Sequence, residues 1–248
     1  MFRRSPVFGA LAAALFCASS LAAAEGIDAS ALEPGPRFAG RITMDFATGA
    51  VTSSPEGVGD VYANATTTAG IGSTDLLAVF GDRVTMTGSG FLDQLNFPIF
   101  NSATSAGPLL TATFTVTFYD GTLPPLPTPL GSFTTELFNF GAGLNPGFFS
   151  DIALTGLSGL GINLPSDVLV TVTIASFTGT MTRPGSVFAD PPTIGTSLLP
   201  APNTFWAQAT TIGGGVPAYY AITAPNGNIR FRINVSDTPV ELSGFSVE

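Results

Sequence analysis

The sequence predicts an all-β protein, an antiparallel two-sheet β-sandwich of jelly-roll type that follows a cleaved signal peptide. Apolar and hydroxyl residues alternate with period two over several segments, which is typical of strands that bury one face. No segment after the first residues has the apolar period and the caps of a helix. The 29 Gly and 20 Pro divide the chain into short elements joined by turns. Together these features favour a sandwich.

The first residues have the three parts of a secretory signal peptide. Met1–Arg4 is positively charged, residues 6–24 are largely apolar, and small residues precede Glu25, so we expect cleavage between Ala24 and Glu25. A membrane anchor is less favoured, because the apolar run is near the lower length limit of a spanning helix. Lipidation at Cys17 is disfavoured by the bulky residue before it. We therefore expect export, to the periplasm or the extracellular space, without a stable membrane anchor.

The remainder predicts one domain. We expect a flexible leader over residues 25–40, which are mostly small and polar, and a single β-sandwich over residues 41–248. The proline-rich residues 123–130 predict a stiff connector, with a ligand for proline-binding modules as the alternative. Residues 191–228 carry no charge and predict a long surface excursion.

Strand positions follow from the alternation. In the clearest strand, Thr113–Tyr119, three apolar residues would face the core and the threonines would face solvent. Residues 167–177 and 228–235 have the same pattern. Weaker strands are expected over 41–47, 82–88, 91–97, 132–140, 148–154, 218–223 and 240–247.

Charge and composition narrow the range of partners. Only 10% of the residues are charged, against about 25% in an average soluble domain, and 45% are hydrophobic. All eight basic residues are Arg, and the net charge of −9 would become −11 once Arg3 and Arg4 left with the signal peptide. An acidic chain with scattered arginines has no basic patch in its sequence, which disfavours nucleic acid and anionic membranes as partners.

Missing residue types exclude whole classes of catalysis. The chain has no His, and its one Cys is Cys17, in the expected signal peptide. A Ser-His-Asp triad, a Cys–His nucleophile, disulfides, and zinc or haem sites with His or Cys ligands are therefore impossible in the mature chain. No P-loop and no helix-opening GxGxxG motif occurs. We therefore predict no catalytic residues and a non-enzymatic protein.

Carboxylates remain for two other kinds of chemistry. A glycan hydrolase or lyase needs two acids that flank the scissile bond. The candidates in or beside predicted strands are Asp45, Asp93, Glu136 and Asp151. No cofactor is predicted, although a structural calcium ion would need only oxygen ligands. The candidates in turn-like contexts are Asp75, Asp82 and Asp120, whose spacing does not match an EF-hand loop. Solvated or turn-capping acids are the simpler interpretation of both sets.

The candidate ligand-binding residues are aromatic. Trp206, Tyr219 and Tyr220 lie in the uncharged excursion, where exposed rings could stack on the sugars of an extracellular polysaccharide. Asn203 and Gln208 lie nearby in the sequence and could bind sugar hydroxyls. The alternative is that the three rings cap the core of the sandwich.

Three segments resemble parts of a known group of proteins. Residues 80–88 (FGDRVTMTG), 116–120 (VTFYD) and 164–170 (LPSDVLV) are similar to strand segments of exported bacterial surface proteins of the PEP-CTERM and choice-of-anchor type. The resemblance implies a secreted or surface-displayed β-sandwich, often in bacteria that produce exopolysaccharide, and it implies no activity and no site residues. The chain departs from the pattern after Val240, where no Pro-Glu-Pro motif, apolar helix or basic tail follows.

Three functions are compatible with these features. The first is a non-enzymatic secreted or surface-associated protein, either a matrix component or a carbohydrate-binding protein. The second is a carboxylate-dependent glycan hydrolase or lyase. The third is a structural subunit that assembles through exposed strand edges.

Overall fold

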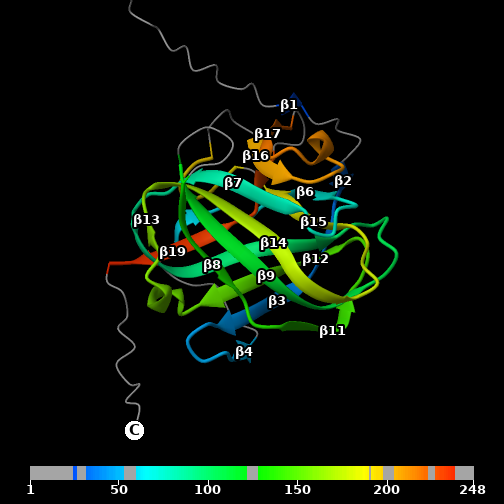
Figure 1. The fold of residues 1–248 in the computed structure, drawn as a ribbon, viewed down its shortest axis with the longest axis horizontal. Helices are drawn as coiled ribbons and strands as arrows, with labels where there is room; N and C mark the ends of the chain where they lie inside the picture. Colours follow the sequence, from blue (N-terminus) through cyan, green and yellow to red (C-terminus); the bar gives the residue numbers. More distant parts are fainter. Residues whose placement is uncertain are drawn as a thin grey trace, which may run out of the picture.

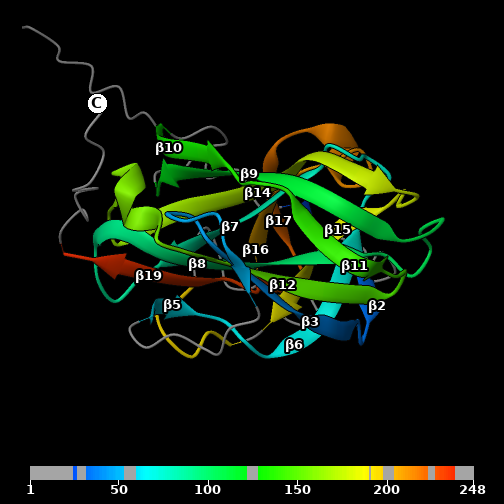
Figure 2. The same cartoon turned by 90° about the horizontal axis from the view of Figure 1, so that it is seen from below.

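The computed structural model describes residues 25–26, 32–52, 60–121, 128–189, 191–197, 204–222 and 227–237. These residues form two β-sheets packed face to face, which confirms the predicted all-β sandwich. In Figure 1, β9 and β14 of one sheet cross over β8 and β12 of the other, and Figure 2 shows the two layers from below.

The first sheet, sheet A, has eight strands. Along its main path they are β1 (Glu25–Gly26), β17 (Ala218–Ala221), β16 (Thr204–Gln208), β7 (Val79–Thr85), β14 (Asp167–Gly179), β9 (Leu109–Asp120) and β10 (Pro129–Thr134). The eighth, β11 (Phe138–Leu144), pairs with β9.

The second sheet, sheet B, has eleven strands. Its main path is β2 (Leu32–Pro34), β6 (Thr67–Gly72), β15 (Pro184–Ala189), β8 (Gly90–Asn101), β12 (Phe148–Thr155), β3 (Arg37–Asp45) and β4 (Val51–Thr52). Beside this path lie β5 (Asp60–Ala63), β13 (Asn163–Leu164), β18 (Asn228–Ile229) and β19 (Arg232–Ser236). The described residues include two short 3-10 helices, η2 (Leu157–Leu160) and η3 (Gly213–Gly215).

Most neighbouring strands run antiparallel, as predicted, but two pairs are parallel: β1 with β17, and β3 with β12. Parallel neighbours cannot be joined by a hairpin, and both pairs join strands that lie far apart in the chain. From β7 to β9, and again from β14 to β16, successive strands alternate between the two sheets. Jelly rolls distribute their strands between two sheets in a similar way.

Strand β9 shows how the alternating pattern builds the core. Phe114, Val116 and Phe118 are fully buried between the sheets, while the threonines between them lie on the outer face. The Phe114 ring meets the Phe97 ring of sheet B edge to face, with centroids 5.2 Å apart. Phenylalanine side chains therefore join the two layers directly.

Strand structure begins earlier than the sequence predicted. Residues 32–34 pair with β6, and β3 starts at Arg37 and pairs with β12. Part of the segment expected to be a flexible leader therefore lies in sheet B. The physical reason is that strand pairing satisfies backbone groups whatever the side chains are. Residues 37–39 have exposed side chains, so they gave no apolar alternation to detect.

Other expectations need smaller changes. The uncharged excursion contains β16 and β17, two strands of sheet A. The strand expected over 132–140 is divided into β10 and β11, and the strand expected over 228–235 into β18 and β19. The signal peptide, most of the proline-rich connector and the strand expected over 240–247 lie outside the described residues. The part of the chain that the structure describes contains no helix of the length and apolarity that a membrane crossing requires.

Candidate functional site

The three predicted aromatic residues lie on neighbouring strands but on two different faces. Trp206 of β16 is paired with Tyr219 of β17, and their side chains lie on the outer face of sheet A in a cluster with Leu169. Tyr220 points the other way, into the main core, where its ring lies 6.1 Å from that of Phe205. Its hydroxyl donates a hydrogen bond of 2.8 Å to the Val216 carbonyl.

These rings do not form an exposed platform. Trp206 is only 4% exposed and Tyr219 only 9%, so neither presents a ring face to solvent, and Tyr220 is also buried. Trp206 Nε1 and Tyr219 Oη are nevertheless buried and have no hydrogen-bond partner among the described residues. Burial raises the pKa of Tyr219 to about 12. Of the two polar residues expected beside the rings, Gln208 is exposed, and Asn203 lies outside the described residues.

Over β9, β10 and β14, the outer face of sheet A carries hydroxyl groups paired across strands. The donor–acceptor distances are 2.7 Å for Thr111–Thr178, 2.8 Å for Thr113–Ser176, 2.9 Å for Thr115–Thr134 and 2.9 Å for Thr117–Ser132. Cross-strand pairs of this kind stabilise a sheet modestly. Each of these hydroxyls already has a partner within the protein.

Asp45 and Asp151, two of the four carboxylates considered for glycan cleavage, lie too far apart to flank one scissile bond. Asp45 accepts hydrogen bonds from the backbone N–H groups of Ala47 and Thr48 and so caps a turn. Asp151 lies on the strand next to it, but their ladder positions are four residues apart, or about 13 Å along the strands. That exceeds the separation of about 6.5–9.5 Å used by inverting glycosidases. The other two acids lie on other elements, Asp93 on β8 and Glu136 between β10 and β11.

The three acids considered for calcium are also separate. Asp75 caps a turn through the N–H of Leu77, Asp82 is buried between the sheets, and Asp120 ends β9. Among the described residues there is no group of three or more side chains that could hold a metal ion.

Asp82 is an unusual buried acid. Its carboxylate accepts hydrogen bonds from the backbone N–H of Ile229 (2.9 Å) and the hydroxyl of Ser197 (3.0 Å). Ile229 belongs to sheet B and Asp82 to sheet A, so the carboxylate links the two sheets. Burial raises the pKa of Asp82 well above its usual value, and these hydrogen bonds oppose that shift only in part.

The outer face of sheet B holds a cluster of charges that sequence reasoning missed. Arg230 forms a two-pronged ion pair with Asp151, with N···O distances of 3.1 and 2.9 Å. Arg41, paired with Asp151 in the β3–β12 ladder, lies 3.7 Å from the same carboxylate. Two guanidinium groups therefore share one carboxylate.

Arg41 has no hydrogen bond of its own. Its side chain is only 16% exposed, yet among the described residues it finds no hydrogen-bond acceptor, and its Nε is fully buried. Thr43, the next residue on the same face of β3, also has a buried hydroxyl with no partner in the described part of the chain. Buried donors without partners are rare in folded proteins and call for an explanation such as a bound molecule.

An exposed ring lies beside these donors. Phe38 is 54% exposed, and its ring lies 5.1 Å from that of Phe149, which is buried on the outer face of sheet B. The guanidinium carbon of Arg230 lies over the Phe149 ring, 5.7 Å from its centroid. A bulge at Gly40 (φ 135°) shifts the register so that Phe38 and Arg41 share this face. We call Phe38, Arg41 and Thr43 the Arg41 patch.

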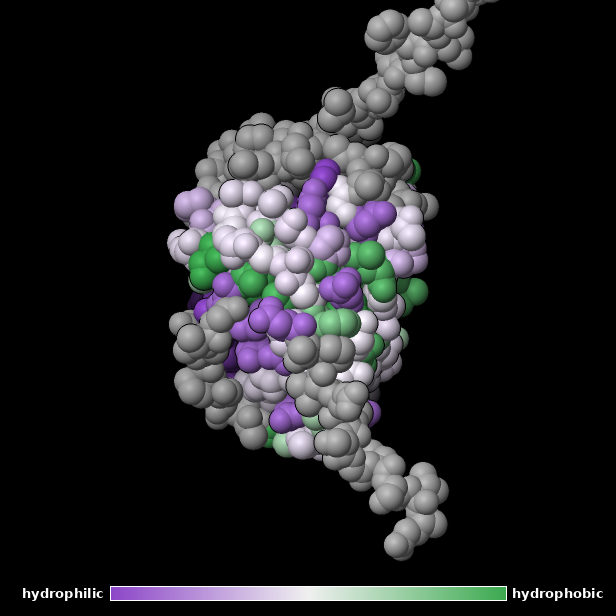
Figure 3. Space-filling view, turned by 90° about the vertical axis from the view of Figure 1, so that its left-hand side faces the viewer, coloured by the Kyte–Doolittle hydropathy of each residue, from purple (hydrophilic) through white to green (hydrophobic). Residues whose placement is uncertain are grey.

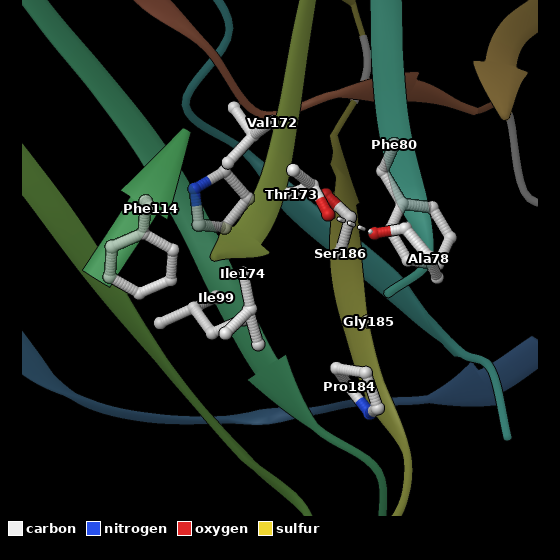
Figure 4. A pocket seen from close by; sticks show the side chains of 11 residues that line it. Ala78, Phe80, Ile99, Phe114, Val172, Thr173, Ile174, Pro184, Gly185 and Ser186 are labelled. Atoms are coloured by element: carbon white, nitrogen blue, oxygen red, sulfur yellow. Dashed lines mark hydrogen bonds between the residues drawn. The ribbon is translucent and has the colours of Figure 1, made fainter. Parts of the chain in front are cut away.

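The pocket shown in Figure 4 offers less chemistry. It lies between the sheets and has a volume of about 20 Å³, room for about one water molecule. No charged residue lines it, and of its two hydroxyls the one on Thr173 donates to the carbonyls of Leu77 and Ala78.

The surface in Figure 3 shows small hydrophobic groups interspersed among hydrophilic ones. Comparison of the chain with family models, with curated proteins and with solved structures found no match. The Arg41 patch therefore rests on its geometry alone. Its members are close because β3 pairs with β12 around a bulge, and no motif in the sequence marks that pairing.

Proposed function

We propose that this chain is a non-enzymatic exported protein that binds glycans, and that the Arg41 patch is its binding surface. The observation that carries the proposal is an exposed Phe38 ring beside Arg41, whose donors have no acceptor in the described part of the protein. Phe149 lies against the Phe38 ring from within the fold.

The combination fits the two kinds of contact that sugars make. The apolar face of a pyranose can stack on an exposed aromatic ring, while its oxygen atoms accept hydrogen bonds from fixed donors. The ring and the donors of the Arg41 patch lie on one strand, and rigid strands hold binding groups more precisely than loops do.

The test is retention of the purified protein on a panel of insoluble polysaccharides. Phe38→Ala should reduce retention about fivefold, because stacking on one ring contributes about 1 kcal/mol. Leu77→Ala is the matched control, because Leu77 is also an exposed apolar side chain (69%) but lies outside the patch. Equal retention of the Phe38→Ala variant and the wild type would refute the assignment of the surface.

The same retention assay tests whether the predicted aromatic residues Trp206 and Tyr219 bind glycans. Trp206→Phe keeps a ring in the buried cluster on sheet A and removes only the indole N–H and part of the packing. Loss of retention in Trp206→Phe, but not in Phe38→Ala, would move the glycan site to Trp206 and Tyr219. Reducing-end release from the panel would favour the hydrolase or lyase instead, and self-association in sedimentation would favour the structural subunit.

A further inference from the structure

We infer that the Arg41 patch recognises an acidic sugar, a uronate residue within a glycan chain, and that Arg41 binds its carboxylate. This inference rests on the proposed glycan-binding function and names the class of ligand.

The first step is the local charge. Arg230 donates from two nitrogens to both oxygens of Asp151, so these two groups already form a complete pair. Arg41 contributes only a 3.7 Å contact to that carboxylate. The cluster of Arg41, Arg230 and Asp151 therefore has a net charge of one positive unit. This charge lies on Arg41, whose side chain is mostly removed from water.

The second step is the set of unused donors. A guanidinium group has five N–H donors in a planar fork, which matches the two oxygens of a carboxylate. The Nε of Arg41 is enclosed, so its terminal nitrogens are the ones that a ligand can reach. A neutral sugar hydroxyl would use one donor and leave the charge uncompensated, whereas a carboxylate would use two donors and neutralise it.

The third step is the spacing. Phe38 and Arg41 occupy successive outward positions of β3 across the bulge, a separation of about 7 Å along the strand. A uronate has its carboxylate at the edge of the sugar ring. A ring stacked on Phe38 can therefore direct its carboxylate along the strand to Arg41.

The net charge of the whole protein restricts the ligand further. At −9 the protein repels a dense polyanion at long range. A carboxylate carried at intervals on a mainly neutral chain meets less of this repulsion. We therefore infer a glycan in which uronate residues are spaced by neutral sugars.

The experiment uses xanthan, a neutral glucan backbone with glucuronate in its side chains, and the same polymer after chemical reduction of its carboxylates to alcohols. Wild-type protein should bind native xanthan at least about tenfold more tightly than the reduced polymer, because a charged hydrogen-bonded pair is lost. Arg41→Ala should bind both polymers equally, and Arg41→Lys should keep part of the preference.

Arg37→Ala is the matched control. It removes the same charge from the same strand, but Arg37 lies over the Phe148 ring rather than beside Asp151, and its preference for native xanthan should be unchanged. Arg41→Ala keeps the Arg230–Asp151 pair, so it should fold, which its melting temperature will verify. Arg41→Gln provides a second variant if it does not.

Two negative results have different meanings. If Phe38→Ala weakens binding but wild type binds native and reduced xanthan equally, the uronate inference is wrong and the glycan-binding proposal stands. If wild type binds neither xanthan nor any neutral glycan of the panel, the proposed function itself fails. A preference for the native polymer that survives in Arg41→Ala would also overturn the role of Arg41.

Discussion

Replacing Asp82 by Asn should make the stability of the protein less dependent on pH. The carboxylate lies between the sheets, where it accepts hydrogen bonds from Ile229 N–H and the Ser197 hydroxyl. An amide fits the same place: its oxygen can accept from Ile229, and its nitrogen can donate to Ser197, whose hydroxyl also donates to the Arg83 carbonyl. The substitution therefore removes the charge and keeps the connections between the sheets.

The direction of this pH effect follows from the raised pKa of Asp82. Because burial favours the neutral carboxyl in the folded state, folded Asp82 retains a proton at pH values where the unfolded chain, with a pKa of about 3.9, has released it. Its stabilising contribution is complete below about pH 3.9 and is lost as pH rises through the folded pKa. Over that window the free energy of unfolding of Asp82→Asn, relative to wild type, should rise by up to about 1.4 kcal/mol per pH unit.

Urea unfolding from pH 4 to pH 8 measures this difference, with the fluorescence of Trp206, the only Trp of the chain, as the signal. Ser197→Ala is a useful companion, because it removes a hydrogen bond that lowers the pKa of Asp82 and should extend the window to higher pH. A difference between Asp82→Asn and wild type that stayed constant with pH, or that moved in favour of wild type as pH rose, would refute the reasoning.

Three further predictions concern packing and buried charge. Gly185→Ala would place a methyl group against the backbone of β6 and should lower the free energy of unfolding by about 2–3 kcal/mol, as measured by chemical unfolding. Gly88→Ala is the control: its new methyl group would have its nearest contact at 3.4 Å, and the free energy of unfolding should change by no more than about 0.5 kcal/mol. Arg230→Ala leaves Asp151, 4% exposed, without its two-pronged partner and should cost about 3 kcal/mol or more; a smaller loss would mean that water or Arg41 replaces it. Tyr219→Phe should cost less than about 1 kcal/mol, because the hydroxyl has no hydrogen bond, and it should remove a phenol that ionises near pH 12 from the alkaline absorbance curve.

The strands that the sequence identified well are those in which one face is buried and the other is open. In β9 the buried phenylalanines and the outward threonines alternate strictly, so period alone located the strand. At the start of β3 the same reasoning failed, because residues 37–39 are all exposed and are held by their pairing with β12. Backbone pairing requires no pattern of polar and apolar side chains, so the apolar period could not locate this part of β3.

The candidate residues show the same limit. Sequence reasoning left Trp206 and Tyr219 either on a surface excursion or capping the core, because an uncharged segment suits both a surface excursion and the strands of a core. Their strands pair with each other and with sheet A, and both rings are buried. The Arg41 patch could not be found in the sequence at all, since Arg41, Asp151 and Arg230 meet only through strand pairing between distant segments.

The contrast between the two outer faces indicates where a ligand binds. On sheet A the hydroxyl groups of β9, β10 and β14 satisfy one another in cross-strand pairs, so a ligand would have to compete with bonds already made. On sheet B the terminal nitrogens of Arg41 make no hydrogen bond to the described residues and have only the 3.7 Å contact with Asp151, so a ligand would displace no hydrogen bond. Forming a hydrogen bond to a buried unsatisfied donor recovers a desolvation cost already incurred on folding. The same number of new contacts should therefore give higher affinity at the Arg41 patch than on the larger hydroxyl face of sheet A.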